Sequence, residues 1–266
     1  MKRKEGHMPI TTRLFDNQRP CDELLALLEQ LKVSHVDTLR GIREVTQTWV
    51  VPGKLRAQIS DDEDRARLPE FLDLFRSLRM VDEISIPESD DPDAPHPSWT
   101  FATIGGAKRR AVEGRWDLLN RLLPRINVQQ IVSLGSGRTL FTDEQLPDLT
   151  LGVESQLMTQ VALSKHSMRG IRLNCVHCPK PSDRNASLED TMKAWIDGAD
   201  PRGDVLGIFS QPYTLQQGAA AQIVYGNRGR ITAIGYSAPS SVGVRGYLDN
   251  VAKWIDAEFR LVALGL

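Results

Sequence analysis

The sequence lacks the features of several specialised protein classes. It contains no apolar run near the ~20 residues that a membrane-spanning helix requires. Its 33 basic residues nearly balance 34 acidic ones, so no overall field would attract nucleic acid or an anionic membrane. Only three cysteines occur, and no apolar segment follows the charged N-terminus. We therefore expect reduced thiols, no export signal and a cytoplasmic protein.

The pattern of apolar residues divides the chain into two regions. Of the 266 residues, 41% are hydrophobic, which is enough for a substantial core. Residues 1–90 carry apolar side chains at helical spacing and predict a helical N-terminal region. The stretch 86–99 holds four prolines and four acids in fourteen residues and cannot bury a core face. A linker is therefore predicted at 91–98.

Residues 99–266 alternate between strand-like and helical patterns. Five apolar runs, each separated from the next by an amphipathic stretch, are typical of βα units. The predicted fold class is thus α/β, a Rossmann-like, mostly parallel sheet with helices on both faces. The strand-like runs are WTFATI (99–104), QQIVSL (129–134), GIRLNCV (170–176), DVLGIFS (204–210) and RITAIGYS (230–237). In such sheets ligands bind at the carboxyl ends of the strands, where the strand order reverses.

Two glycine-rich junctions follow the first two strands. Gly105 and Gly106 precede the basic segment 108–110 and Arg115, which would offset the charge of an anion bound to the backbone. The alternative is a tight turn before a helix with a solvated basic face. The second junction contains Gly135, Ser136, Gly137 and Arg138 and resembles an anion-binding nest, although a plain loop also fits it.

Polar side chains at later junctions are candidates for chemistry. Glu154 lies at a predicted helix start, either as a first-turn acid favoured by the helix dipole or as a ribose anchor and general base. Ser210, Gln211 and Tyr213 stand where a strand gives way to a helix, and we expect them to orient a reacting group.

Two other motifs have structural explanations. Ser187 and Asp190 have the spacing of a capping box. Cys175, His177 and Cys178 lie close together, but zinc needs about four ligands and no second pair matches them. We expect no metal site.

Taken in order, the junctions resemble the YdcF/SanA/ElyC-like family of Rossmann-related domains, whose function is not known. That family has two glycine-ended strands, a helix with an arginine, a Glu-Ser helix start, a Thr-x-Glu-Asn-like segment and a final strand end with serine or threonine, histidine and arginine. The matching residues here are Gly105, Gly106, Arg115, Gly135, Gly137, Glu154-Ser155, the segment 187–190 and Ser210. This chain departs from the pattern at Tyr213 and Gln216, which replace the family's histidine and arginine.

The resemblance covers roughly residues 99–260 and implies a cleft for a small anionic or nucleotide-like ligand. One hypothesis is a hydrolase or transferase acting on a nucleotide-like or phosphorylated metabolite. The second is a non-catalytic module that binds a nucleotide or S-adenosylmethionine, which one branch of the family is associated with. Cleavage of an N-glycosidic bond ranks third, because no second carboxylate is evident. The N-terminal helices are expected either to pair two copies or to cap the cleft.

Overall fold

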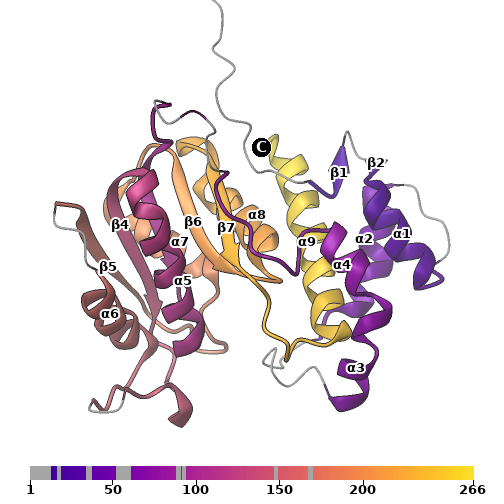
Figure 1. Ribbon diagram of the computed structural model, residues 1–266, viewed down its shortest axis with the longest axis horizontal. Coiled ribbons are helices and arrows are strands. Elements are labelled where there is room, and N and C mark those ends of the chain that lie inside the picture. The colour runs from indigo at the N-terminus through magenta and orange to yellow at the C-terminus, as the bar shows by residue number, and fades with distance from the viewer. Residues whose placement is uncertain are drawn as a thin grey trace, which may run out of the picture.

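A five-stranded, fully parallel sheet forms the centre of the α/β region (Figure 1). The computed structural model describes residues 13–16, 19–33, 38–51, 61–87, 91, 94–146, 149–166 and 170–266. The strands are β3 (Ser98–Gly105), β4 (Asn127–Ser136), β5 (Arg172–Cys178), β6 (Val205–Ser210) and β7 (Ile231–Tyr236). All five predicted strands are therefore confirmed, as is the α/β class.

The sheet has the order β5-β4-β3-β6-β7. From β3 the chain moves outward through β4 to β5, then crosses back to β6 and continues to β7. The strand order thus reverses between β3 and β6, and the ends of these two strands form the switch point where ligands bind in folds of this type.

Helices cover both faces of the sheet. In Figure 1, α5 and α6 lie in front of it, while α7 and α8 lie behind. The helices of this region are α5 (Arg109–Leu122), α6 (Glu154–Lys165), α7 (Leu188–Ala199), α8 (Thr214–Tyr225) and α9 (Val244–Leu264). The capping box predicted at the start of α7 is confirmed, because Ser187 Oγ accepts from Asp190 N while Ser187 N donates to the Asp190 carboxylate.

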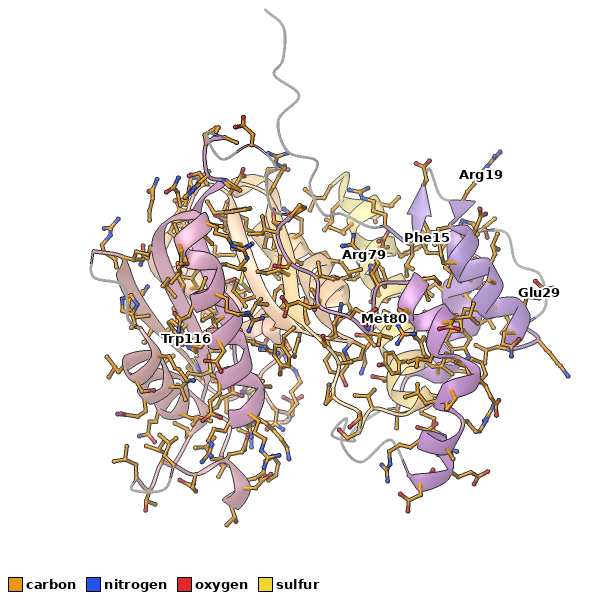
Figure 2. All side chains as sticks on the ribbon, viewed as in Figure 1. Phe15, Arg19, Glu29, Arg79, Met80 and Trp116 are labelled. Atoms are coloured by element: carbon orange, nitrogen blue, oxygen red, sulfur yellow. The ribbon has the colours of Figure 1, made fainter. Side chains whose placement is uncertain are left out.

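Each face of the sheet has its own hydrophobic core. Trp116, on α5, is fully buried among side chains of α5, α6, β3 and β4, and Figure 2 labels it. On the opposite face, Trp195 of α7 packs edge-on against Phe101 and stacks on Tyr225 of α8. Two buried faces explain why the central strands read as nearly continuous apolar runs.

In its described part, the N-terminal region is mostly helical, as predicted, and packs against α9. Its elements are β1 (Phe15–Asp16), β2 (Arg19–Pro20), α1 (Asp22–Gln30), α2 (Leu39–Thr46), α3 (Asp62–Ala66) and α4 (Leu72–Ser77). Phe75 of α4 stacks on Tyr247 of α9 with ring centroids 4.4 Å apart. Figure 2 labels Phe15 and Met80, which belong to the same hydrophobic cluster as Trp254 of α9. This third core therefore contains residues from both ends of the chain.

The segment after α4 also reaches the sheet. Ile84 forms an antiparallel bridge with Gly235 of β7, and the Gln211 amide donates to the carbonyls of Arg79 and Asp82. Part of the predicted linker, residues 92–93, lies outside the described residues, and the boundary at 91–98 stays a prediction. Within the described part of the chain, no helix combines the length and apolarity needed to cross a membrane.

Candidate functional site

Arg115 joins the two strand ends at the switch point. The side chain comes from the second turn of α5, is 3% exposed, and donates from Nη1 to the carbonyl oxygens of Gly105 at 2.7 Å and Gly106 at 3.3 Å. Its Nη2 donates to Ser210 Oγ at 3.1 Å. Arg115 therefore holds the end of β3 to the end of β6.

The start of α5 follows the end of β3 by a few residues and is strongly basic. Lys108 is its N-cap and forms no side-chain cap, and the first turn contains no acid. Lys108 pairs with Asp143 at 3.2 Å, and Arg109 pairs with Glu113 at 3.3 Å and donates to the Gln145 carbonyl. Arg110 is exposed. Helix dipoles favour acids at this end, so the cations add to an already positive site.

A second polar network surrounds Glu154, the first residue of α6. Its Oε2 accepts hydrogen bonds from Ser136 Oγ at 2.6 Å and from Ser136 N at 3.1 Å. Its Oε1 accepts from Arg138 Nη2 at 3.1 Å and from Nε at 3.3 Å. Four donors thus occupy a carboxylate that is only 6% exposed.

Arg138 connects Glu154 to a second buried acid. Its two terminal nitrogens each donate to one oxygen of Glu144 at 2.8 Å, and Glu144 is 1% exposed. Burial opposes the charge of Arg138, but its contacts with Glu144 and Glu154 outweigh that effect and raise the pKa of the guanidinium. The result is a buried network of one cation and two carboxylates.

Close packing explains two of the predicted ligand-binding glycines. A Cβ atom at Gly106 would lie 2.5 Å from Glu154 Oε2, and one at Gly137 would lie 2.9 Å from Lys180 N. Gly106 therefore brings the Arg115 contacts and the Glu154 network together. These contacts explain why glycine is needed at both positions without invoking a ligand. The two loops nevertheless lie at the carboxyl edge of the sheet.

The structure brings most of the predicted site residues to this edge. Gly105, Gly106, Arg115 and Ser210 form the switch-point cluster, and Ser136, Arg138 and Glu154 form the adjoining network. Three others have different surroundings. Gln211 holds the 79–82 segment, Tyr213 is the N-cap of α8, and Gly135 lies under the first turn of α6.

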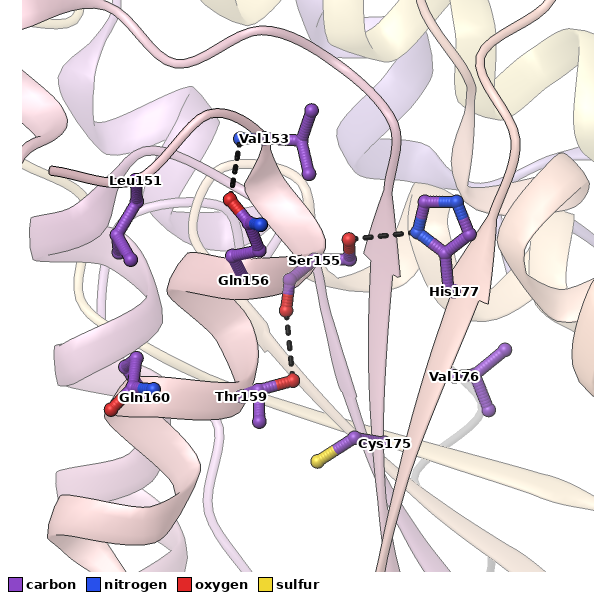
Figure 3. Close-up of a pocket in the computed structure, with 9 residues that line it drawn as sticks. All are labelled: Leu151, Val153, Ser155, Gln156, Thr159, Gln160, Cys175, Val176 and His177. Carbon is purple, nitrogen blue, oxygen red and sulfur yellow. Dashed lines mark hydrogen bonds between the residues drawn. The ribbon is translucent and has the colours of Figure 1, made fainter.

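A groove beside the edge strand β5 was missed by the sequence analysis. It has a volume of about 430 Å³ and lies between β5 and α6 (Figure 3). In it, Ser155 Oγ lies 2.8 Å from Nδ1 of His177, and Thr159 Oγ1 donates to the Ser155 carbonyl at 2.9 Å. Ser155 and His177 are 22 positions apart, and no local motif links them.

The two cysteines of β5 have thiols with raised pKa values. Burial raises the pKa of Cys175 and of Cys178 above the ordinary value, so both favour the thiol over the thiolate. In the described ranges, no group of three histidine, cysteine, aspartate or glutamate side chains could hold a metal ion.

Comparisons with protein-family models, curated proteins and solved structures found no match for this chain. The relation to the YdcF/SanA/ElyC-like family stays a resemblance that rests on the junction residues.

Proposed function

We propose that this protein binds a nucleotide-like or phosphorylated small molecule at the switch point between β3 and β6. One observation carries the proposal: α5 begins at the switch point with three consecutive cations, Lys108 to Arg110, and no acid in its first turn. The positive end of the helix dipole and the basic side chains both favour an anion there. The strand order supports the same location.

The surroundings of Glu154 favour binding without turnover. A general base needs a free lone pair within reach of the substrate, whereas this carboxylate already accepts four hydrogen bonds. A ribose anchor has the same requirement, so Glu154 does not fit the ribose of S-adenosylmethionine as it stands. We therefore assign Glu154 a positioning role at the start of α6.

A hydrolase or transferase is the second candidate. It is favoured by the Ser210 hydroxyl, which Arg115 holds at the switch point. On that reading Ser210 and Tyr213 orient a phosphorylated substrate bound at the start of α5. Incubating the protein with each bound compound for several hours and analysing the products separates the two candidates, because a binding module returns its ligand unchanged.

Thermal unfolding with a panel of compounds tests the binding site. The panel contains inorganic phosphate, mono-, di- and triphosphate nucleotides, sugar phosphates and S-adenosylmethionine. A ligand at a hundredfold excess over its dissociation constant stabilises the folded state by about 2.7 kcal/mol, which raises Tm by several degrees.

Variants of two exposed cations locate any ligand found. Arg110→Ala should weaken binding, because the exposed Arg110 lies in the first turn of α5. Lys193→Ala is the matched control, since Lys193 is an exposed cation of α7 that pairs with Asp197. A panel without any shift, or a shift that both variants reduce equally, contradicts the proposed site.

A further inference from the structure

We propose that Ser155 and His177 form a nucleophile–base pair that hydrolyses small uncharged esters in the groove between α6 and β5. The primary observation is the 2.8 Å contact between Ser155 Oγ and His177 Nδ1 (Figure 3). This is the distance at which an imidazole takes a proton from a hydroxyl nucleophile. The pair is separate from the switch-point site, and the inference does not depend on the function proposed there.

The fold brings the two residues together through a glycine. Gly135 of β4 pairs in register with His177 of β5, and a Cβ atom at Gly135 would lie 2.5 Å from the Cα of Ser155. The missing side chain thus lets the first turn of α6 rest directly on the sheet. On the other side of that turn, Glu154 is held by Ser136 and Arg138. Ser155 is therefore positioned from both sides.

The helix start favours the negative charge that develops during ester cleavage. Ser155 is the second residue of α6, where the dipole stabilises anions. Its own N–H is among the first-turn amides that a helix leaves without an intrahelical acceptor. We expect that N–H to donate to the oxyanion of a carbonyl attacked by Ser155 Oγ.

The groove is uncharged, which defines the substrate class. Leu151, Val153 and Val176 line it with apolar surface, and Gln156, Thr159 and Gln160 add neutral polar groups. Among the described residues, no lysine, arginine, aspartate or glutamate lines it. Its volume of about 430 Å³ suits a small ligand. A phosphorylated compound would find no counter-charge in this groove, whereas a neutral ester would not need one.

The reaction balances with water as the only co-reactant. Ser155 Oγ attacks the carbonyl carbon while its proton passes to His177 Nδ1. The tetrahedral oxyanion collapses and breaks the bond to the leaving alcohol, which takes the proton from Nδ1. Water then attacks the acyl-serine and gives a proton to Nδ1. Collapse of the second oxyanion releases the carboxylic acid and returns the proton to Ser155.

Hydrolysis of p-nitrophenyl acetate by the full chain tests the proposal. Ser155→Ala and His177→Asn should each lower the second-order rate constant by ~100-fold or more, the usual loss when an acid–base or nucleophilic group is removed. The asparagine side chain keeps an acceptor for the Ser155 hydroxyl but is no base. Ser182→Ala and His96→Asn change exposed residues outside the groove and should keep rates within about twofold of the parent.

Peptide mapping after acylation identifies the nucleophile directly. The acetyl group, or a fluorophosphonate label, should be found on Ser155 and be lost in His177→Asn. An unchanged rate in Ser155→Ala, or a label on another residue, overturns the proposal. Ester hydrolysis is measured without any compound of the anion panel, and the thermal shifts are measured without ester, so failure of the anion site and failure of the ester site are distinguishable.

Discussion

Glu154 and Ser155 are consecutive in the first turn of α6, yet they have opposite surroundings. Glu154 is buried and accepts four hydrogen bonds from Ser136 and Arg138. Ser155 is half-buried, faces an open groove, and its hydroxyl contacts one titratable side chain, His177. A buried carboxylate with four hydrogen bonds is fixed in place. A hydroxyl beside an imidazole can instead transfer its proton to that ring. The comparison indicates that Glu154 fixes the start of α6 and thereby holds Ser155 beside His177.

The largest predicted effect comes from removing the cation of the buried network. Arg138→Ala would leave Glu144 and Glu154 buried without their shared partner, and we expect a loss of about 3–5 kcal/mol in the free energy of unfolding. Urea denaturation measures it. Arg230→Ala is the control, because the Arg230 side chain is 73% exposed beside Asp204 and its loss should cost under about 1 kcal/mol. Similar losses in both variants would show that the network is not what stabilises this region.

Another buried carboxylate, on α9, extends the comparison, because neutral groups donate the hydrogen bonds described for it. Glu258 of α9 is 5% exposed and accepts from Leu14 N and Trp254 Nε1, each at 3.1 Å. Burial raises its pKa from 4.5 to about 7, against smaller opposing effects of these donors and of Arg13. Unlike Glu154, it is not bound by an arginine side chain in the hydrogen bonds described.

That raised pKa predicts a pH-dependent stability. Between pH 4.5 and about 7 the folded protein keeps a proton that the unfolded chain has released, so the free energy of unfolding falls as pH rises. The full effect is about 3 kcal/mol at 1.36 kcal/mol per pKa unit. Urea denaturation at several pH values should show this slope in the parent chain and a flatter one in Glu258→Gln. Equal slopes in the parent chain and in Glu258→Gln would show that Glu258 does not cause the pH dependence.

Gly135 tests how closely α6 packs against the sheet at Ser155. Gly135→Ala would place a Cβ atom 2.5 Å from the Ser155 Cα, and overpacking of this kind costs about 1–3 kcal/mol. Gly198→Ala is the opposite case: Gly198 lies inside α7 with nothing within 4 Å of the added atom, so alanine should stabilise by up to about 1 kcal/mol. Thermal unfolding should therefore shift in opposite directions, and shifts of the same sign would refute the packing argument.

The smallest effect is expected at an exposed helix start. Ser187→Ala removes the cap from Asp190 N, which should cost about 1 kcal/mol. Arg184 still holds Asp190 through two hydrogen bonds, so the loss should stay well below that of Arg138→Ala. Urea denaturation measures both variants side by side. A cost equal to that of Arg138→Ala would erase the distinction between the buried network and solvent-exposed hydrogen bonds.

Local patterns were sufficient for the elements of the α/β region. The run DVLGIFS predicted β6, which is fully buried, because a strand covered on both faces needs apolar side chains throughout. Ser187 and Asp190 predicted their capping box, since both partners lie within one helical turn. The carboxyl ends of the strands could likewise be expected to gather Gly105, Ser136 and Ser210, because parallel strands end at the same edge.

Contacts between distant residues could not be predicted in this way. Nothing near Gln211 indicates that its amide bonds the carbonyls of Arg79 and Asp82, and nothing near His177 indicates Ser155. The role of Arg138 as the shared partner of Glu144 and Glu154 also depends on contacts between residues 6 and 16 positions apart in the chain.

The sequence by itself therefore determined the fold class, the strand positions and the edge of the sheet where polar residues collect. Those properties follow from hydrophobic periodicity and from capping, which act within a few residues. Only the tertiary structure decided that the Glu154 carboxylate is already satisfied and that Ser155 meets His177. Both results depend on the close packing of α6 against Gly106 and Gly135, which is set by the approach of separate elements.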